Sequence, residues 1–297
     1  MSRSRGGVAA IAMEAFVALA LFGCIPVAVK YVHANAYTIG IVRLGVATAF
    51  VLAATAIRRE LRPLPRRDVI RLAVIGTLFF AHWLTYFLSI KISSVAIGAI
   101  GLSTYGVDLL ILGALAGHGR IRFLDIVAVL LAVAGAVVVV PSAGGGKGAV
   151  VGMLLALLSA LFYATLPILH QRAVHIPTSI RTLGQFGVAL LLFLLFLPKS
   201  NWDLNGRDWG ALLFLAIGAT LIAHTLWVRV TTAISPAAAS VVYYGNVPFA
   251  VLLGVVVLGE PLTWYTAAGA LLIIAGGVAG LVPQLQHRRA AAPAPEV

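Results

Sequence analysis

Residues 81–94, AHWLTYFLSIKISS, have a counterpart at residues 223–236, AHTLWVRVTTAISP. Ala81-His82 falls on Ala223-His224 at an offset of 142 positions, and Ile92-Ser93-Ser94 falls on Ile234-Ser235-Pro236 at the same offset. Further matches, the last two with a gap of one or two residues, are Gly45-Val46-Ala47 with Gly187-Val188-Ala189, Gly135 with Gly277, Ala20-Leu21-Phe22 with Ala160-Leu161-Phe162, and Pro26 with Pro167. The two halves of the chain are therefore repeats of one another.

The composition places both repeats in a lipid bilayer. Hydrophobic residues make up 61% of the 297 positions and charged residues 10%, and the mean hydropathy is +1.05. Soluble domains carry about 45–50% apolar and about 25% charged residues. Apolar runs long enough to cross about 30 Å of hydrocarbon as helices lie at residues 8–31, 37–57, 71–90, 94–116, 122–141, 149–170, 180–197, 209–230, 236–258 and 262–282. The sequence thus predicts an all-α integral membrane protein with about ten transmembrane helices.

Each repeat holds five runs, an odd number, so the second repeat must insert upside down relative to the first. The loop charges agree, because residues 58–67 carry five arginines whereas the equivalent residues 199–208 balance two basic with two acidic side chains. Inverted repeats related by an axis in the membrane plane are typical of secondary transporters. We expect a first five-helix repeat at residues 1–145, an inverted second repeat at 146–283, and a disordered cytoplasmic tail at 284–297.

The formal net charge of +12 comes largely from arginines in the short segments between apolar runs. This distribution indicates how the chain is oriented in the membrane rather than nucleic-acid binding. With the N-terminus inside, fifteen basic residues fall in cytoplasmic segments and five on the opposite side, the bias that the positive-inside rule describes. We expect a multi-pass protein of the cell (cytoplasmic) membrane with both termini in the cytoplasm. Its expected partners are the lipid bilayer and a small-molecule substrate, and the fused repeats make a monomer plausible.

Catalytic and metal-binding motifs are missing from the sequence. It contains no G-x-S-x-G, no H-E-x-x-H and no clustered metal ligands. Cys24 is the only cysteine, which excludes an intrachain disulfide and Cys-rich metal sites. We therefore expect no enzyme activity, no cofactor and no bound metal.

Two adjoining elements of the second repeat resemble a known family. Val257-Leu258-Gly259-Glu260-Pro261-Leu262-Thr263, followed by Gly269–Gly277, is similar to the ninth-to-tenth-span signature of EamA-type transporters, which belong to the drug/metabolite transporter (DMT) superfamily. Other elements that resemble this pattern are Phe22-Gly23 with Lys30, Arg43-Leu44, and Ile92-Ser93-Ser94-Val95-Ala96. The resemblance implies ten helices, no bound cofactor, and transport of small organic molecules such as amino acids or metabolites, usually outward.

The first repeat departs from that family pattern at two places. Gly117-His118-Gly119-Arg120-Ile121 stands where the second repeat has its Gly-Glu-Pro element, and it lacks both the acid and the proline. Tyr105-Gly106-Val107-Asp108 stands where the family more often has a proline and apolar residues. These departures leave the expected fold intact and the substrate open.

Four ionisable residues within apolar runs are candidates for coupling or ion pairing, because a charge inside a membrane is costly. Glu14 either carries a coupling proton or pairs with a cytoplasmic arginine. Asp108 takes part in coupling or substrate binding, or forms a structural ion pair with Arg43 or a histidine. Lys30 either extends to the membrane interface or joins Arg43 in attracting a substrate carboxylate.

The symmetry-related His82 and His224 lie at the centre of a predicted substrate pocket. His82 shares a helix face with Trp83 and Tyr86, and His224 shares one with Trp227. Two aromatic–histidine patches near the membrane midplane would line a pocket for an apolar or aromatic substrate; the alternative is ordinary helix packing, with each histidine bonded to a neighbour. Residues that mark a weakened ninth helix are Tyr243, Tyr244, Gly245, Asn246 and Pro248. The predicted substrate-binding residues are His82, Trp83, Tyr86, Tyr105, His224, Trp227, Tyr243 and Asn246.

These patterns predict a secondary transporter that exports small amphipathic metabolites by alternating access. Amino acids, aromatic ones included, are the narrower expectation. A facilitator without coupling and a carrier of organic phosphates or drugs with the same fold stay open as alternatives. A membrane-embedded enzyme and a channel are the alternatives from other classes.

Overall fold

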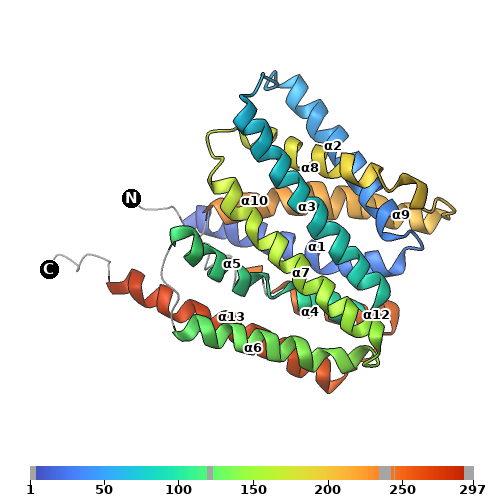
Figure 1. Cartoon of the computed structure of the whole chain (residues 1–297), viewed down its shortest axis with the longest axis vertical. Coiled ribbons are helices and arrows are strands. Elements are labelled where there is room, and N and C mark those ends of the chain that lie inside the picture. Colours follow the sequence, from blue (N-terminus) through green and yellow to red (C-terminus); the bar gives the residue numbers. More distant parts are fainter. Residues whose placement is uncertain (1–4, 119–122, 234–241, 244, 291–297) are drawn as a thin grey trace.

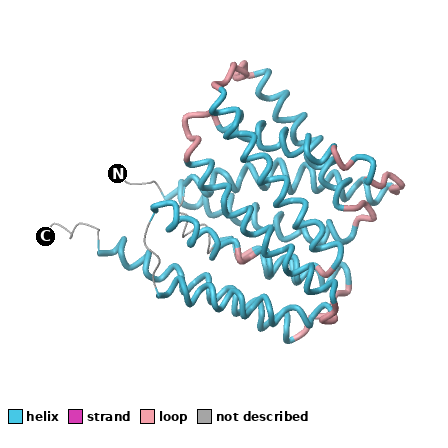
Figure 2. Tube along the Cα trace, viewed as in Figure 1, coloured by secondary structure: helices cyan, strands magenta, loops and turns pink. Residues whose placement is uncertain are grey.

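The apolar runs form helices that are joined by short loops at the two ends of the molecule (Figures 1 and 2). The computed structural model describes residues 5–118, 123–233, 242–243 and 245–290. The first half contains α1 (Arg5–Tyr31), α2 (Ala36–Ile57), α3 (Arg66–Ile92), α4 (Val95–Leu102), α5 (Tyr105–Gly113), η1 (Ala114–His118) and α6 (Phe123–Val139). The short η2 (Val140–Ala143) ends the first half. The second contains α7 (Lys147–Gln171), α8 (Thr178–Leu194), η3 (Leu197–Lys199), α9 (Gly206–Phe214), η4 (Leu215–Ile222), α10 (Ala223–Ala233), α12 (Asn246–Leu258) and α13 (Trp264–Ala290).

These elements supply ten helical spans. Seven stretches are long and apolar enough to cross a membrane, and three shorter apolar helices, at 178–194, 246–258 and 264–276, complete the set. The fourth span is made of α4 and α5, and the eighth runs from α9 through η4 into α10.

The two halves pack against each other in a two-fold arrangement. Helix α3 packs on α7, and its repeat equivalent α10 packs on α1, the equivalent of α7. In the same way α4 packs on α7 while α12 packs on α1. Helices α2 and α8 contact each other, as do α6 and α13, which run side by side along one edge of the molecule (Figure 1). The prediction of an all-α membrane protein built from two inverted five-helix repeats is confirmed.

Glycines allow α6 and α13 to approach each other closely. A Cβ atom added to Gly135 would lie 2.7 Å from the carbonyl oxygen of Gly269, and one added to Gly269 would lie 2.7 Å from the carbonyl oxygen of Gly135. No real Cβ atom tolerates such a distance, so both positions require glycine. Small residues at helix contacts are the usual basis of close packing inside a membrane.

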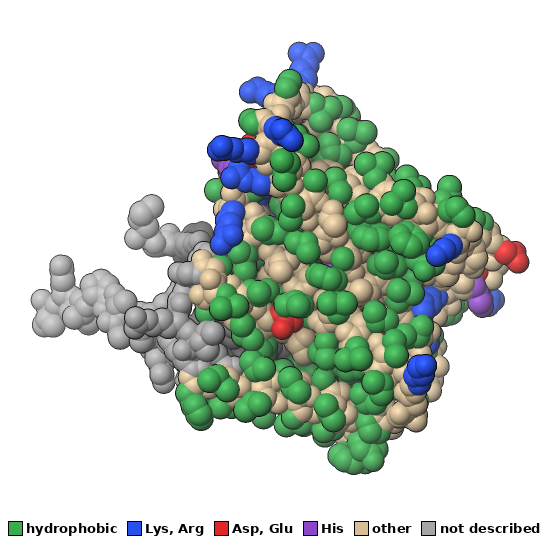
Figure 3. All heavy atoms as spheres, in the orientation of Figure 1, with side chains coloured by type: hydrophobic (Ala, Val, Ile, Leu, Met, Phe, Trp, Pro, Cys, Tyr) green, Lys and Arg blue, Asp and Glu red, His purple; other side chains and the backbone are tan. Residues whose placement is uncertain are grey.

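Hydrophobic side chains cover most of the face of the molecule that Figure 3 shows. Leu130, Val137 and Leu271 are more than half exposed. Apolar side chains at the surface of a membrane protein are expected where the surface faces lipid. Basic side chains gather at the end of the molecule where α2 meets α3, and Arg58, Arg59 and the other arginines of that loop are exposed there (Figures 1 and 3).

The Gly-Glu-Pro element of the second repeat holds a helix of the first. Gly259 ends α12 with a φ of +67°, a left-handed conformation that favours glycine. The Glu260 carboxylate then accepts hydrogen bonds from the backbone N–H groups of Val95 at 2.8 Å and Ala96 at 3.4 Å, the first residues of α4. A carboxylate at this position satisfies free N–H groups and complements the helix dipole. The element therefore fixes the start of α4.

The fourth span is interrupted. The sequence predicted one continuous span at residues 94–116 and gave no sign of the interruption. Helix α4 ends at Leu102 and α5 begins at Tyr105. Between them the Ser103 hydroxyl donates to the carbonyl of Ile100 at 2.6 Å, and the Thr104 hydroxyl donates to that of Gly101 at 2.9 Å. Such side-chain bonds compete with the helical backbone pattern.

The ninth span has a helix boundary at the equivalent place. Helix α12 begins at Asn246, with Gly245 as its N-cap residue, and the 142-residue offset maps Ser103 onto Gly245. The described helices α5 and α12 therefore begin at nearly equivalent positions of the two repeats.

The first residues of the predicted tail belong to a helix. Helix α13 continues to Ala290, so residues 284–290 are helical, because Gln284-Leu285-Gln286 and the residues after them are good helix formers. Features that lie outside the described residues are the match at Ile234-Ser235-Pro236, Tyr244, Gly119-Arg120-Ile121 and the tail from residue 291.

Candidate functional site

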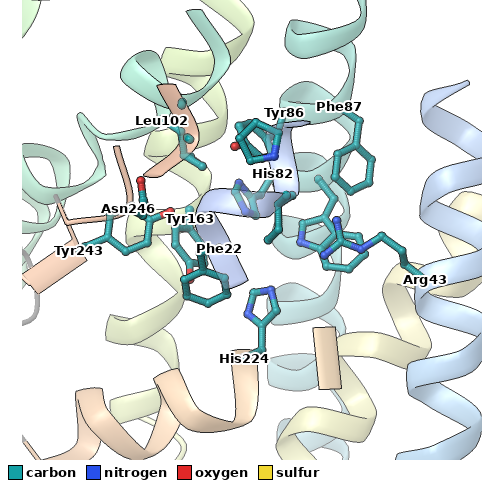
Figure 4. A pocket seen from close by; sticks show the side chains of 15 residues that line it. Phe22, Arg43, His82, Tyr86, Phe87, Leu102, Tyr163, His224, Tyr243 and Asn246 are labelled. Atoms are coloured by element: carbon teal, nitrogen blue, oxygen red, sulfur yellow. The ribbon is translucent and has the colours of Figure 1, made fainter. Parts of the chain in front are cut away.

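A cavity lies where the two repeats meet, and side chains from both line it (Figure 4). The first repeat contributes residues of α1, α2, α3 and α4, and the second contributes residues of α7, α10 and α12 together with Tyr243. Most of the lining is aromatic or aliphatic, with Arg43, His82, His224 and Asn246 as the polar exceptions besides the tyrosine hydroxyls. An apolar cavity with a few polar groups is typical of small-molecule binding sites.

Two histidine–aromatic pairs stand on the two sides of this cavity. The His82 ring on α3 stacks on the Tyr163 ring of α7, with centroids 4.5 Å apart and planes 13° from parallel. The His224 ring on α10 meets the edge of the Phe22 ring of α1 at 5.1 Å. Phe22 falls on Tyr163 at the offset of 141 that Pro26 and Pro167 give, one residue from the match of Phe22 with Phe162. The two-fold axis thus relates the pairs.

The hydrogen bonds of the two histidines differ. Nδ1 of His82 lies 2.7 Å from the Ser159 hydroxyl, and that hydroxyl donates to the carbonyl of His82 at 2.9 Å. This contact fixes the ring of His82 between α3 and α7. The His224 ring instead lies among other rings, with its centroid 5.9 Å from that of Phe79 and 6.1 Å from that of Trp83.

Arg43 reaches the same cavity from α2. Its side chain is 1% exposed, its Nε donates to the Thr220 hydroxyl at 3.1 Å, and its guanidinium carbon lies 4.1 Å from the centre of the Trp83 ring. The Phe87 ring lies on the same guanidinium at 5.3 Å. Thr220 belongs to the π-helical segment η4, and its hydroxyl donates to the carbonyl of Leu215 at 2.8 Å. π-Helical segments are frequent at functional sites.

Tyrosines form the wall opposite Arg43 (Figure 4). The Tyr243 ring lies 4.9 Å from that of Tyr105 and 5.6 Å from that of Trp227, and its hydroxyl is hydrogen-bonded to the Asn246 side chain. Tyr105 also lies 4.7 Å from Tyr163. This wall joins the fourth and ninth spans, since Tyr105 begins α5 and Tyr243 precedes α12.

Polar contacts join the repeats at one end of the cavity, which we name the Asp208 end. The Asp208 carboxylate accepts from the backbone N–H of His33 at 2.9 Å and contacts Nδ1 of His33 at 3.0 Å. The Asn201 side chain accepts from the backbone N–H of Asn35 at 2.6 Å, and the Thr38 hydroxyl donates to the carbonyl of Asn201 at 2.8 Å.

A second set joins them at the opposite end, which we name the Asp68 end. The Asp68 carboxylate at the start of α3 contacts Nε2 of His175 at 3.0 Å and Nη1 of Arg71 at 2.7 Å. Ser179 donates its hydroxyl hydrogen to the carboxylate of Glu60. Cross-repeat contacts therefore lie at both ends of the cavity.

The structure brings most of the predicted substrate residues together. His82, Trp83, Tyr86, His224, Tyr243 and Asn246 line the cavity. Tyr105 and Trp227 pack against Tyr243 behind this lining.

Three of the four ionisable candidates lie away from the cavity lining. Glu14 on α1 forms an ion pair with Arg229 of α10, with 2.7 Å between Oε1 and Nη2. Lys30 donates to the carbonyl oxygens of Ile90 at 3.0 Å and Ser93 at 2.5 Å, at the end of α3. Asp108 is half-buried on α5, where its carboxylate interacts with the Thr104 side chain.

The ion pair between Asp108 and Arg43 that the sequence suggested is absent from the described part of the chain. Arg43 is engaged by Thr220 and Trp83 instead, and Asp108 by Thr104.

Sequence reasoning missed several residues of the site. They are Phe22, Phe87 and Tyr163 in the lining and Ser159 and Thr220 behind it. A signal was available for two of them, because Ser159 and Tyr163 are four residues apart and share a helix face.

Comparison with known proteins agrees with this architecture. The model of the EamA-like transporter family matches the chain twice, at residues 10–140 and 150–279. The chain belongs to this family. Its members are transporters, so this EamA-like protein is a transporter of the DMT superfamily rather than an enzyme.

Solved structures support the same fold. One crystal structure matches 96% of this EamA-like chain and 99% of its own, with 21% identity and a TM-score of 0.66. At that identity the likeness shows the fold alone. Comparison with curated proteins finds no match.

Proposed function

We propose that this EamA-like protein is a secondary transporter that moves small amphipathic metabolites, aromatic amino acids among them, out of the cell by alternating access. The observation that supports this most is the aromatic cavity between the two repeats, whose lining pairs His82 with Tyr163 and His224 with Phe22. Rings and imidazoles suit a substrate with an apolar body and a few polar groups.

Alternating access needs two gates, and the two polar sets at the ends of the cavity supply candidates. We propose that residues 1–145 and 146–283 move against each other as the two units. Breaking the contacts between His33 and Asp208 would open the Asp208 end, and breaking those between Asp68 and His175 would open the Asp68 end. The interruption of the fourth span and the start of α12 lie between these gates, the position at which many transporters bind substrate.

We place the Asp68 end and both chain termini in the cytoplasm. The exposed arginines of the α2–α3 loop support this orientation, since short cytoplasmic loops carry an excess of basic residues. The Asp208 end then faces outward.

Coupling to protons is proposed for Glu14 or Asp108. Glu14 is paired with Arg229 across the α1–α10 contact, so protonation of Glu14 would release a link between the repeats. Asp108 lies one turn beyond the interruption of the fourth span. A facilitator would lack any such dependence on a proton gradient.

Counterflow into proteoliposomes tests the proposal. Vesicles are loaded with unlabelled tryptophan, phenylalanine, threonine or a cationic dye, one at a time, and uptake of the labelled compound is followed. We expect saturable counterflow of the aromatic amino acids that falls when His82 and His224 are replaced by alanine. Absence of counterflow with every compound would contradict the proposed substrate class, and unsaturable flux would indicate a channel.

A further inference from the structure

The guanidinium of Arg43 has an unused donor in the cavity wall. Its Nη2 is fully buried and has no hydrogen-bond partner, while Nε is bonded to Thr220. We propose that Arg43 is the subsite for a carboxylate group of the transported molecule, and that the cargo is an amphipathic monocarboxylate whose amino group, where it has one, is dispensable. This proposal rests on the transport function and names its substrate class.

A buried arginine without a counter-charge is costly in a protein interior and more so within a membrane. Among the described residues the Arg43 guanidinium contacts a neutral hydroxyl and the faces of Trp83 and Phe87. Ring faces offset part of the cost of burying a cation, but they accept no hydrogen bond from Nη2. A bound carboxylate would supply both the missing acceptor and the missing negative charge.

The surroundings hold the guanidinium in one orientation. Thr220 is itself fixed by its bond to the carbonyl of Leu215, so it anchors Nε of Arg43, and Trp83 covers one face of the plane at 4.1 Å. An arginine held in this way presents its remaining N–H groups edge-on, the geometry in which guanidinium binds carboxylate oxygens. The close-up shows the Arg43 side chain extending from α2 toward the ring of Phe87 and the space beside His224 (Figure 4).

The charge of the cavity lining favours one class of transported molecule over others. Within the described residues Arg43 is the one side chain with a permanent charge that lines the cavity, and no acidic side chain does. An ammonium group would find only neutral acceptors such as Asn246 and the tyrosine hydroxyls. A phosphate ester carries about two negative charges and would have one cation to meet them. A single carboxylate on an aromatic or aliphatic body matches both the charge and the apolar lining.

Thermal stabilisation of the purified full-length protein in detergent tests this inference directly. Three probes share a phenyl ring: 3-phenylpropionate carries only a carboxylate, phenethylamine only an amine, and phenylalanine both. We expect saturable stabilisation by 3-phenylpropionate and phenylalanine, and none by phenethylamine. Stabilisation by phenethylamine alone, or no stabilisation by 3-phenylpropionate, would overturn the assignment.

Two substitutions locate the binding group. Arg43→Gln should raise the Kd of 3-phenylpropionate by about 10- to 100-fold, the loss expected for hydrogen bonds to a charged group. Arg43→Lys keeps a cation, which protects against misfolding. It should weaken binding less than Arg43→Gln because the charge remains, and it should still weaken binding because a lysine lacks the planar fork. The matched control Arg58→Gln, at an exposed arginine of the α2–α3 loop, should bind like the native protein. Unchanged binding in both Arg43 variants would refute the proposal.

Failure of this inference and failure of the transport function give different results. Binding of 3-phenylpropionate through Arg43 without counterflow of that compound would contradict transport and leave the carboxylate subsite intact. Counterflow of phenethylamine that persists in Arg43→Lys would support transport and overturn the subsite.

Discussion

Substituting Asp208 should open one end of the transporter. The Asp208 carboxylate is 2% exposed and accepts from the backbone N–H groups of His33 at 2.9 Å and Asn205 at 3.1 Å, besides the His33 ring. Asp208→Asn keeps the size and one acceptor oxygen but removes the charge. Hydrogen bonds to a charged group contribute about 1.5–3 kcal/mol, and the His33 ring, whose side chain is 76% exposed, adds little to that.

A loss of about 1.5–2 kcal/mol from the closed form corresponds to a roughly 10- to 30-fold rise in the population that is open at the Asp208 end. The rise is measured as the labelling rate of Ala250→Cys, a position in the cavity lining, by a membrane-impermeant thiol reagent added outside intact cells. The native Cys24 is first replaced by alanine, so that the reagent has one target.

The matched control is His33→Ala, which removes the exposed ring and keeps the backbone N–H that bonds to Asp208. It should change the labelling rate by no more than about three-fold. Equal rates in the native protein and Asp208→Asn would refute the reasoning that this contact closes the outer end. If His33→Ala raised the labelling rate as much as Asp208→Asn does, the reasoning would also be refuted, because the His33 ring rather than the buried backbone contact would then close this end.

Three further predictions concern the scaffold and the coupling. Glu260→Gln, which removes the charge that caps α4, should lower stability by about 1 kcal/mol, seen as a lower Tm in detergent, whereas Glu60→Gln should lower it less. Gly135→Leu should separate α6 from α13 and reduce the yield of folded protein in size-exclusion chromatography, and a normal yield would contradict the close packing. Asp108→Asn should abolish gradient-driven transport while sparing exchange, and unchanged driven transport would exclude Asp108 from coupling.

The repeat was the part of the fold that sequence could reveal most fully. Ala81-His82 and Ala223-His224 lie at one offset, and in the structure His82 and His224 stand on opposite sides of one cavity. The prediction succeeded because a two-fold axis places equivalent residues at equal depth, whatever the details of packing.

Backbone interruptions were harder to predict. Gly245 and Pro248 marked the ninth span, because glycine and proline weaken helices wherever they occur. Ser103 and Thr104 gave no comparable signal in the fourth span, since serine and threonine interrupt a helix only where their hydroxyls bond to nearby carbonyls.

The hydrogen-bond partners of long polar side chains also depend on tertiary packing and were not predicted. The sequence offered Arg43 two partners, Asp108 and a substrate, but the hydroxyl that holds it belongs to Thr220, in a π-helical segment 177 positions away. No local sequence pattern predicts a π-helical turn, so this contact could not be predicted from the sequence. The same holds for Lys30, whose carbonyl partners lie at the end of α3.

A reversible lock across the Asp208 end tests most directly whether the repeats alternate around the cavity. Thr38 and Asn201 touch across the two repeats, with their side-chain oxygens 3.3 Å apart, so cysteines at these two positions can be joined by a short reducible crosslinker in a protein without Cys24. We predict that crosslinking stops counterflow of labelled phenylalanine in proteoliposomes and that reduction restores it. Counterflow at the full rate with the crosslink in place would contradict alternating access through this cavity.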